Sequence, residues 1–380
     1  MHKVMDSFTM KINLVIFVLL FVLGCQTNQK EIMEESISNS FYVGTYTDSV
    51  SHGIYKYKLR QDGILEKIGL AAKSNNPSFL AKSSNQKYLL AVSEIDRNST
   101  GEIVSFLIAG DSLQPISSSS SGGAHPCFVS VNKDGFVLAA NYTGGNVGLL
   151  RLNKNGELSS LLDVEQHTGK GTTDRQKAPH AHSAWFNPFD NNIISIDLGT
   201  NELWFSYLDT LEQKLIPSEP QKLSMNPGAG PRHLVFHPNN KWIYIINELN
   251  STITLVEKSG ENKYKKFSSI STLPNGYNEP SFCADIHISS DGKFIYASNR
   301  GHNSIAIFKV NDLDGSLGLV NIHPCGGSWP RNFSLSPDEE YLLVANQKTN
   351  NIVSFKRDKS TGLLKYSSEI EAPNPVCILF

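Results

Sequence analysis

A short apolar run recurs seven times along this chain of 380 residues. Each run ends at a small or polar residue, and consecutive copies lie between 47 and 56 residues apart. The aligned positions are Thr45, Ser93, Asn141, Asp197, Asn247, Asn299 and Asn346. A repeat of this period indicates that the chain is built from copies of one supersecondary unit, each burying its apolar faces against its neighbours.

The residues around each run indicate strands and not helices. In the fifth copy, the alternating segment 232–238 precedes the run at 242–249, and the β-rich segment 251–257 follows it. Turn-forming residues such as those at 290–292 (Ser-Asp-Gly) separate segments of this kind, and a more variable fourth strand completes each set. Helical periodicity is nearly absent, which argues against helical and leucine-rich solenoids. Four antiparallel strands per repeat predict an all-β fold, a seven-bladed β-propeller over residues 41–380.

The two ends of the repeat region predict how such a ring would close. The first copy, at residues 41–46, lacks its leading strand, and the chain finishes with an unpaired strand-like segment at residues 375–380. The C-terminal strand can therefore pair with the N-terminal strands as the innermost strand of their blade. This closure removes the exposed edges that an open array of sheets would leave.

The N-terminal forty residues differ in character from the repeats. Residues 12–23 form an apolar run that is too short for a membrane-spanning helix but suits the hydrophobic region of a signal peptide. Leu23-Gly24-Cys25 resembles a lipobox, which directs lipid attachment to the cysteine. We expect a lipoprotein signal peptide over residues 1–24, lipidation at Cys25 and a flexible polar tether over residues 25–40. The protein would then be lipid-anchored in the cell envelope, on the periplasmic side or in the outer membrane, and cytoplasmic only if the signal is not used.

The net charge argues against nucleic acid as a partner, and the positions of the cysteines argue against disulfides and a zinc site. The formal net charge is −2, so the chain lacks the basic field of a nucleic-acid-binding protein. The cysteines after Cys25 are Cys127, Cys283, Cys325 and Cys377. All but Cys325 lie in apolar strand-like runs, where cysteine behaves as a small hydrophobic residue, and no zinc-type spacing occurs. The sequence predicts neither a disulfide framework nor a zinc site.

Histidines and arginines recur at one position of the repeat. The first two strands of a blade form a hairpin, so the start of the first strand and the end of the second lie at the same mouth of the central channel. Residues before or at the start of first strands are His125, His180, His182, Arg232, His233 and Arg331. Residues at or just beyond the ends of second strands are Glu94, Tyr142, Glu248, Arg300, His302 and Gln347. A mouth with this composition indicates a binding site for a small anion.

Each of these residues also has a purely structural interpretation. The arginines could pair with carboxylates of neighbouring blades, and Glu248 could be the partner of such an arginine. His180 and His182 are spaced to lie on one face of a strand, as metal ligands would. No third ligand of matching spacing follows, so we expect no metal and no cofactor.

Six motifs resemble those of the propeller-type 6-phosphogluconolactonase, or lactonase, family, which also contains the carboxy-cis,cis-muconate cyclases. They are 41–47 (FYVGTYT), 140–146 (ANYTGGN), 230–238 (GPRHLVFHP), 246–249 (INEL), 297–302 (ASNRGH) and 343–347 (LVANQ). The resemblance extends from about residue 41 to the C-terminus. It implies a seven-bladed fold and lactone chemistry.

The resemblance also implies a catalytic group of one histidine, two arginines and one glutamate. By motif context these are His182 (or His180), Arg232, Arg300 and Glu248. We expect substrate-binding roles for His180, His233, His302, Arg331 and Gln347. His182 or Glu248 would be the general base on water, and His182 is favoured because histidine titrates near neutrality, whereas flanking arginines lower the pKa of a glutamate.

We therefore expect a metal-independent hydrolase acting on a small anionic or sugar lactone. A phosphorylated substrate conflicts with a location outside the cytoplasm, because 6-phosphogluconolactone is a cytoplasmic metabolite. Two alternatives remain: a lactonising cyclase or isomerase at the same mouth, and a non-catalytic exported propeller that binds a glycan or a protein.

Overall fold

The computed structural model describes residues 39–380, apart from residues 49, 261 and 262. The predicted signal peptide, Cys25 and nearly all of the predicted tether lie outside the described residues. Residues Phe41–Phe380 form one compact unit. Within the part of the chain that the structure describes, no helix has the length and apolar character needed to cross a membrane.

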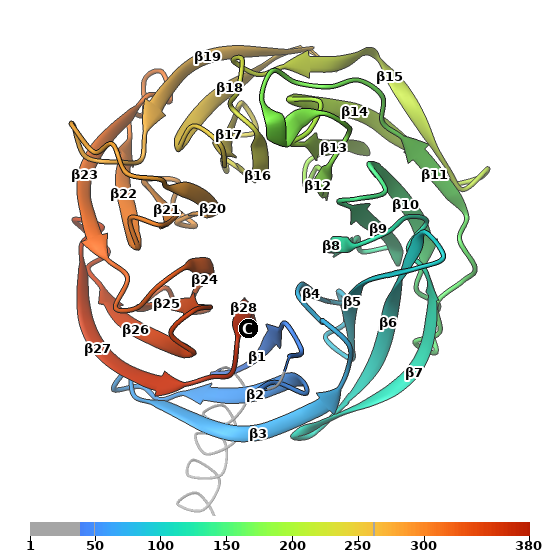
Figure 1. The fold of residues 1–380 in the computed structure, drawn as a ribbon, viewed down its shortest axis with the longest axis horizontal. Helices are drawn as coiled ribbons and strands as arrows, with labels where there is room; N and C mark the ends of the chain where they lie inside the picture. The colour runs from blue at the N-terminus through green and yellow to red at the C-terminus, as the bar shows by residue number, and fades with distance from the viewer. Residues whose placement is uncertain (1–38, 49, 261–262) are drawn as a thin grey trace, which may run out of the picture. The chain divides into compact units, whose positions relative to one another are not determined.

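Seven four-stranded antiparallel sheets are arranged in a circle around a central axis (Figure 1), as the repeats predict. The innermost strands of blades 1 to 7 are β28 (Pro375–Leu379), β4 (Leu80–Lys82), β8 (Pro126–Val131), β12 (Ala181–Phe186), β16 (Pro231–Phe236), β20 (Phe282–Ile288) and β24 (Pro330–Leu335). The second strands are β1 (Ser40–Thr45), β5 (Tyr88–Arg97), β9 (Phe136–Asn141), β13 (Asn192–Asp197), β17 (Trp242–Asn247), β21 (Phe294–Arg300) and β25 (Tyr341–Asn346). The third strands are β2 (Gly53–Leu59), β6 (Thr100–Ala109), β10 (Asn146–Arg151), β14 (Glu202–Asp209), β18 (Thr252–Gly260), β22 (Ser304–Val310) and β26 (Asn351–Arg357). The outermost strands are β3 (Leu65–Lys73), β7 (Ser112–Ser120), β11 (Asp163–Gln166), β15 (Lys214–Ser224), β19 (Lys263–Ser271), β23 (Leu317–Pro324) and β27 (Leu364–Glu371).

The C-terminal strand closes the ring, which confirms the sequence prediction. β28 pairs antiparallel with β1, with Tyr42 opposite Leu379 and Gly44 opposite Cys377. Figure 1 shows β28 beside the central channel, next to β1. Blade 1 is thus assembled from both ends of the propeller unit, and no blade is left with an unpaired inner edge.

The second strands are apolar on both faces because each blade packs between two others. Every residue of β17 is buried. Its side chains alternate: Tyr244 and Ile246 pack in a cluster with residues of blade 6, and Ile243 and Ile245 pack in a cluster with residues of blade 4. This explains why the recurring motif is a continuous apolar run and not an alternating one.

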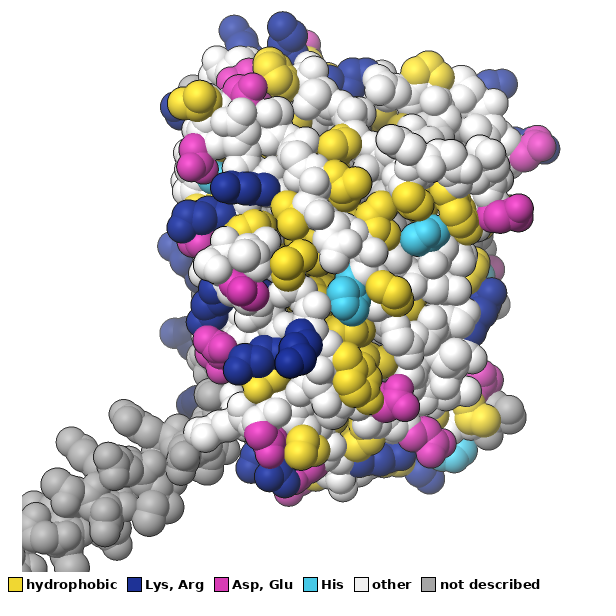
Figure 2. All heavy atoms as spheres, turned by 90° about the vertical axis from the view of Figure 1, so that its left-hand side faces the viewer, with side chains coloured by type: hydrophobic (Ala, Val, Ile, Leu, Met, Phe, Trp, Pro, Cys, Tyr) yellow, Lys and Arg dark blue, Asp and Glu magenta, His cyan; other side chains and the backbone are white. Residues whose placement is uncertain are grey.

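The outermost strands are partly exposed and carry a mixed surface. β19 alternates between exposed and partly buried residues over most of its length. Figure 2 shows the wall on the side of β23 and β27, where apolar patches lie among charged and uncharged polar side chains.

The polar residue that ends each apolar run has a structural role. In three blades an asparagine at this position donates a hydrogen bond to a carbonyl just after the outermost strand of the preceding blade. These bonds join Asn141 to Ser121 (2.9 Å), Asn299 to Thr272 (3.0 Å) and Asn346 to Cys325 (3.1 Å). Each bond holds the connection that enters the next inner strand, which fixes the backbone at the mouth where the predicted site residues lie.

The four cysteines of the propeller unit, Cys127, Cys283, Cys325 and Cys377, are buried and free. The burial of Cys127, Cys283 and Cys377 agrees with their interpretation as small apolar side chains, and Cys325, which lies outside the apolar runs, is buried as well.

Candidate active site

A pocket of about 430 Å³ opens at one mouth of the central channel. Six of the seven blades contribute to its wall. The lining residues are Glu94, Cys127, Tyr142, Arg175, His182, Glu248, Phe282, Arg300, Trp329 and Arg331. Residues distant along the chain therefore meet around one opening, as the hairpin geometry of each blade predicts.

Glu248, which directly follows β17, is the centre of an ion-pair cluster. Its Oε2 atom lies 2.7 Å from Nη2 of Arg300 and 3.2 Å from Nε of Arg232. Its Oε1 atom accepts a hydrogen bond from Nη2 of Arg175 at 3.1 Å. The side chains of Glu248, Arg232 and Arg300 are each no more than 6% exposed, whereas that of Arg175 is 50% exposed.

The cluster fixes the charge of the carboxylate. Burial acts to raise the pKa of Glu248, but Arg300, Arg232 and Arg175 outweigh it and lower the pKa to about 2. Burial and the neighbouring Arg300 and Arg331 lower the pKa of Arg232 to about 10. Glu248 is thus an anion at neutral pH and is poorly suited to accept a proton.

Backbone carbonyls of β20 hold both buried arginines in place. Nη2 of Arg300 donates to the carbonyl of Cys283 at 3.0 Å, and Nη1 of Arg232 donates to the carbonyl of Ala284. The Nε group of Arg232 is buried and lacks an aligned hydrogen bond, although it contacts the Glu248 carboxylate.

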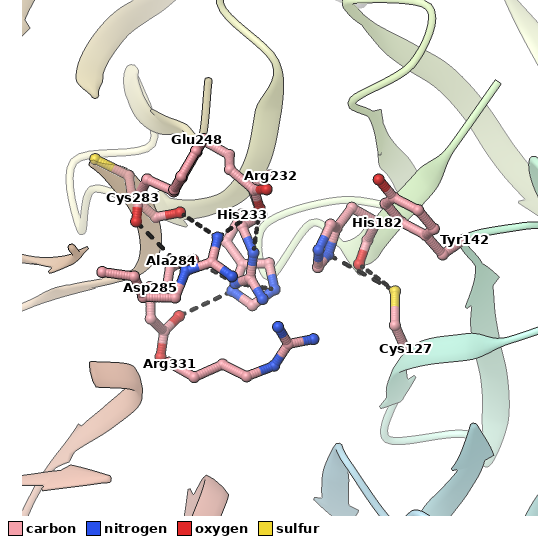
Figure 3. A network of polar contacts seen from close by, with 12 residues as sticks. Cys127, Tyr142, His182, Arg232, His233, Glu248, Cys283, Ala284, Asp285 and Arg331 are labelled. Carbon is pink, nitrogen blue, oxygen red and sulfur yellow. Dashed lines mark hydrogen bonds and ion pairs between the residues drawn. The ribbon is translucent and has the colours of Figure 1, made fainter. Parts of the chain in front are cut away.

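Arg331 differs from the other arginines because no carboxylate lies within ion-pair distance among the described residues. Its Nη2 donates to the phenolic oxygen of Tyr46 at 2.7 Å, and Tyr46 in turn donates to Oε2 of Glu94 at 2.9 Å. Figure 3 shows the Arg331 side chain reaching into the same open space that His182 faces. Arg331 is therefore available to a substrate anion.

His182 lies on β12 with one ring nitrogen against a sulfur atom. Its Nδ1 is 3.7 Å from Sγ of Cys127, and the Cys127 thiol lies 3.4 Å from the carbonyl oxygen of His182, to which it can donate (Figure 3). Its ring packs edge-on against the rings of Tyr142 and His233. Burial, followed by the charge of Arg232, holds the pKa of His182 well below its usual range, so the imidazole is neutral at pH 7.

His233 lies behind Arg232 and does not line the pocket. Its Nε2 is 3.3 Å from Nη1 of Arg232, and its Nδ1 is 2.8 Å from Oδ1 of Asp285 (Figure 3). Burial, followed by the charge of Arg232, lowers the pKa of His233 to about 4. Asp285 also contacts His287 at 3.1 Å. His233 thus connects a buried carboxylate to an arginine of the cluster.

Besides His233, three further predicted substrate-binding residues do not line the pocket, which leaves Arg331 as the one of the five that does. His180 stacks on Tyr142 with ring centroids 4.5 Å apart, so it supports a lining residue. His302 pairs through Nδ1 with the hydroxyl of Ser304. The backbone N–H of Gln347 donates to the carbonyl of Trp329. Of the two histidines that the sequence left open, only His182 faces the pocket.

Sequence reasoning missed Arg175 altogether. It belongs to a 3-10 turn, η1 (Asp174–Gln176), in the connection between β11 and β12. One signal could have found it: the interval from Asn141 to Asp197 is the longest in the repeat, which indicates inserted residues in this blade. The sequence predicts Cys127 only as an apolar residue, because nothing in its context points to a histidine on the next blade.

The pocket offers no cluster of metal ligands. Over residues 39–380, with the three undescribed positions left aside, no group of three or more His, Cys, Asp and Glu side chains is arranged to hold a metal ion.

Comparison with known proteins places this architecture in a family. A family described as a seven-bladed β-propeller lactonase matches residues 40–380. The chain is 37% identical to a 6-phosphogluconolactonase of Bacillus subtilis over 89% of its length and 97% of that protein. It is 35% identical to a 6-phosphogluconolactonase of Formosa agariphila, with 85% and 94% covered. The solved structure of a periplasmic gluconolactonase of Pseudomonas aeruginosa superimposes with a TM-score of 0.85, 28% identity and coverage of 90% and 98%. The chain therefore belongs to the seven-bladed β-propeller lactonase family, as its motifs predict.

Proposed function

We propose that this protein hydrolyses a sugar lactone at the arginine-lined mouth, without a metal or a cofactor. The observation that carries the proposal is the meeting of His182, Arg300 and Arg331 in one pocket, whose wall also contains the ion-paired Glu248. Relatives named as 6-phosphogluconolactonases and as a gluconolactonase support the class of substrate.

His182 is the proposed general base. The Cys127 thiol can donate its proton to the backbone carbonyl of His182 at 3.4 Å, and a sulfur lone pair would then face Nδ1 of His182. This arrangement favours the tautomer with its proton on Nδ1 and an unprotonated Nε2. A neutral imidazole can take a proton from water at neutral pH, which the ion-paired Glu248 cannot do.

The reaction then proceeds in two proton transfers. Nε2 of His182 removes a proton from water while the water oxygen attacks the lactone carbonyl. Arg331 and Arg300 stabilise the negative charge that develops on the carbonyl oxygen, an effect usually worth a few kcal/mol per donor. The ring C–O bond breaks, and the imidazolium returns the proton to the departing alkoxide. The product is the open-chain hydroxy acid.

Glu248 positions the arginines in this proposal. Its Oε2 contacts both Arg232 and Arg300, and its negative charge offsets part of the repulsion between them. A concave pocket with buried charges is typical of an enzyme. A propeller that binds a glycan or a protein would be expected to present a broad, flat rim instead.

A substrate panel tests the proposal. The purified protein is assayed for acid release from glucono-1,5-lactone, its 6-phosphate and a muconolactone, each corrected for spontaneous hydrolysis. We expect turnover of at least one sugar lactone, and a loss on the order of 100-fold or more in His182→Gln and Arg331→Gln. Full activity in both variants would refute the assigned residues, and conversion of the muconolactone alone would favour the cyclase.

We also propose that the protein is exported and lipid-anchored through Cys25. The lipobox-like sequence supports this, as does the similarity to a protein named as periplasmic. Metabolic labelling with a fatty acid tests it: the wild type should be labelled in the membrane fraction, and Cys25→Ser should not. Equal labelling of both, or of neither, would refute the anchor.

A further inference from the structure

The connection between β11 and β12 contributes Arg175 to the pocket wall and is held by a buried glutamine. The side chain of Gln176 is fully buried. Its Nε2 donates to the carbonyl of Leu198 at 2.8 Å and to Oδ1 of Asn201 at 3.1 Å. Its Oε1 accepts from the backbone N–H of Thr172 at 3.2 Å. These bonds fix the 3-10 turn η1 to blade 4, so the residue before Gln176 has a defined place.

That residue, Arg175, reaches from the rim into the pocket. One nitrogen, Nη2, donates both to the phenolic oxygen of Tyr142 at 3.0 Å and to Oε1 of Glu248 at 3.1 Å. Among the described residues, neither Nε nor Nη1 of Arg175 has a hydrogen-bond partner. The guanidinium is thus anchored through Nη2, while Nε and Nη1 keep free donors.

Arg175 is not needed to hold Glu248 in place. The two buried arginines, Arg232 and Arg300, both contact Oε2 of Glu248, whereas Arg175 contacts Oε1 alone. Removal of Arg175 leaves those two ion pairs intact. The half-exposed Arg175 is therefore the member of the cluster whose donors remain open to a ligand.

We infer that Arg175 is a specificity-determining residue that binds an anionic group of the substrate remote from the lactone carbonyl. The inference rests on the proposed function and deepens it, because it assigns discrimination between anionic and neutral sugar lactones to this rim arginine, with the 6-phosphate as the anionic probe. Guanidinium groups bind phosphate oxygens through charge-assisted hydrogen bonds, and Nε and Nη1 of Arg175 each keep a donor open to such a bond.

Arg175→Gln tests the inference with a matched control on the same turn. Lys177→Gln removes a neighbouring positive charge that is paired with Asp174 at 2.9 Å and does not line the pocket. Both variants and the wild type are compared by kcat/KM on 6-phosphoglucono-1,5-lactone and glucono-1,5-lactone. We expect Arg175→Gln to lower the ratio of kcat/KM for the phosphorylated lactone to kcat/KM for the neutral lactone by about 10- to 100-fold. The change should come mainly from a higher KM for the phosphorylated lactone. Lys177→Gln should leave the ratio within about twofold.

A binding measurement separates this inference from the proposed function. Calorimetric titration with 6-phosphogluconate and gluconate compares ligands that differ by one phosphate. Arg175→Gln should weaken the affinity for 6-phosphogluconate by a similar factor and leave the affinity for gluconate unchanged. If the wild type turns over neither lactone, the proposed function fails, and the titration still decides the role of Arg175. Equal losses for both ligands, or no loss for 6-phosphogluconate, would overturn the inference.

Discussion

Nδ1 of His182 has the sulfur atom of Cys127 as its hydrogen-bonding neighbour, at 3.7 Å, and not a carboxylate. A carboxylate in this place would stabilise the imidazolium and raise its pKa. A neutral sulfur does not stabilise the imidazolium, and burial, together with the charge of the nearby arginines, lowers the pKa of His182 further. The histidine therefore stays neutral while its ring orientation is still fixed.

Cys127→Ala should lower kcat by about 3- to 10-fold with little change in KM. The substitution removes the contact that orients His182. Cys127 lies in the pocket wall but neither moves a proton nor donates to the lactone carbonyl in the proposed reaction, and a weak hydrogen bond is worth on the order of 1 kcal/mol. Steady-state kinetics on the best lactone of the panel measure the effect. Cys127→Ser, which keeps an acceptor, should recover part of kcat. An unchanged kcat in Cys127→Ala would contradict the positioning role.

The rate should stay constant between about pH 6.5 and 8 and fall only in more acidic solution. A general base acts in its unprotonated form, so activity is lost as pH falls through the pKa of His182, which lies well below 6.5. Initial rates at saturating lactone, corrected for spontaneous hydrolysis, give the profile. A midpoint at or above pH 7 would contradict the depressed pKa.

Glu248→Gln should destabilise the fold by about 3–5 kcal/mol, because it leaves buried arginines without their counter-charge. Urea unfolding followed by circular dichroism measures the loss. Glu66→Gln is the matched control, since Glu66 pairs with Arg60 at 3.3 Å and both side chains are about half exposed. An exposed pair contributes at most about 1 kcal/mol, so similar losses in the two variants would count against a buried charge cluster.

The sequence predicts the fold better than it predicts the site. The blade count, the strand order and the ring closure follow from the repeat, because packing between two neighbours makes each second strand apolar on both faces. The shared mouth follows from the hairpin geometry, which brings Glu248, Arg300 and Arg331 together. These features depend on position within the repeat, which the sequence displays.

Contacts between side chains of different blades could not be predicted. His233 directly follows Arg232, the equivalent of Arg331 in its blade, yet its ring turns to Asp285, a residue with no motif of its own. Arg175 lies in an insertion that has no counterpart in the other repeats, so no alignment of the copies could place it. Side-chain direction and inserted segments are set by tertiary packing, which one sequence does not display.

His233 should make the fold less stable as pH falls from about 6.5 to 4. Its folded pKa, about 4, lies below the value near 6.5 expected in the unfolded chain. The unfolded chain therefore binds a proton in this window that the folded protein excludes. The stabilisation is complete above pH 6.5 and is lost towards pH 4, by on the order of 3 kcal/mol. His233→Gln should show a weaker dependence in urea unfolding at pH 7, 5.5 and 4.5, and parallel curves would contradict the assignment.

Deletion of residues 375–380 should prevent formation of a stable monomer. The deletion removes β28, exposes the inner edge of β1 and uncovers apolar residues that Val376, Cys377 and Ile378 bury. An exposed edge strand next to an open core promotes aggregation. Size-exclusion chromatography and thermal unfolding compare the truncated chain with the full one.

A peptide with the sequence of residues 374–380, added during refolding, supplies the control for this deletion. If strand pairing with β1 is what closes the ring, the peptide should restore monomer, and a peptide with Cys377→Pro should not, because proline removes a backbone donor and Gly44 lies opposite this position. The truncated protein could instead be monomeric and unfold at the same temperature as the full chain. Six blades and the three remaining strands of blade 1 would then be enough for a stable fold without ring closure. That result would contradict the idea that both ends of the propeller unit must meet before the mouth, and the arginines around it, are held in place.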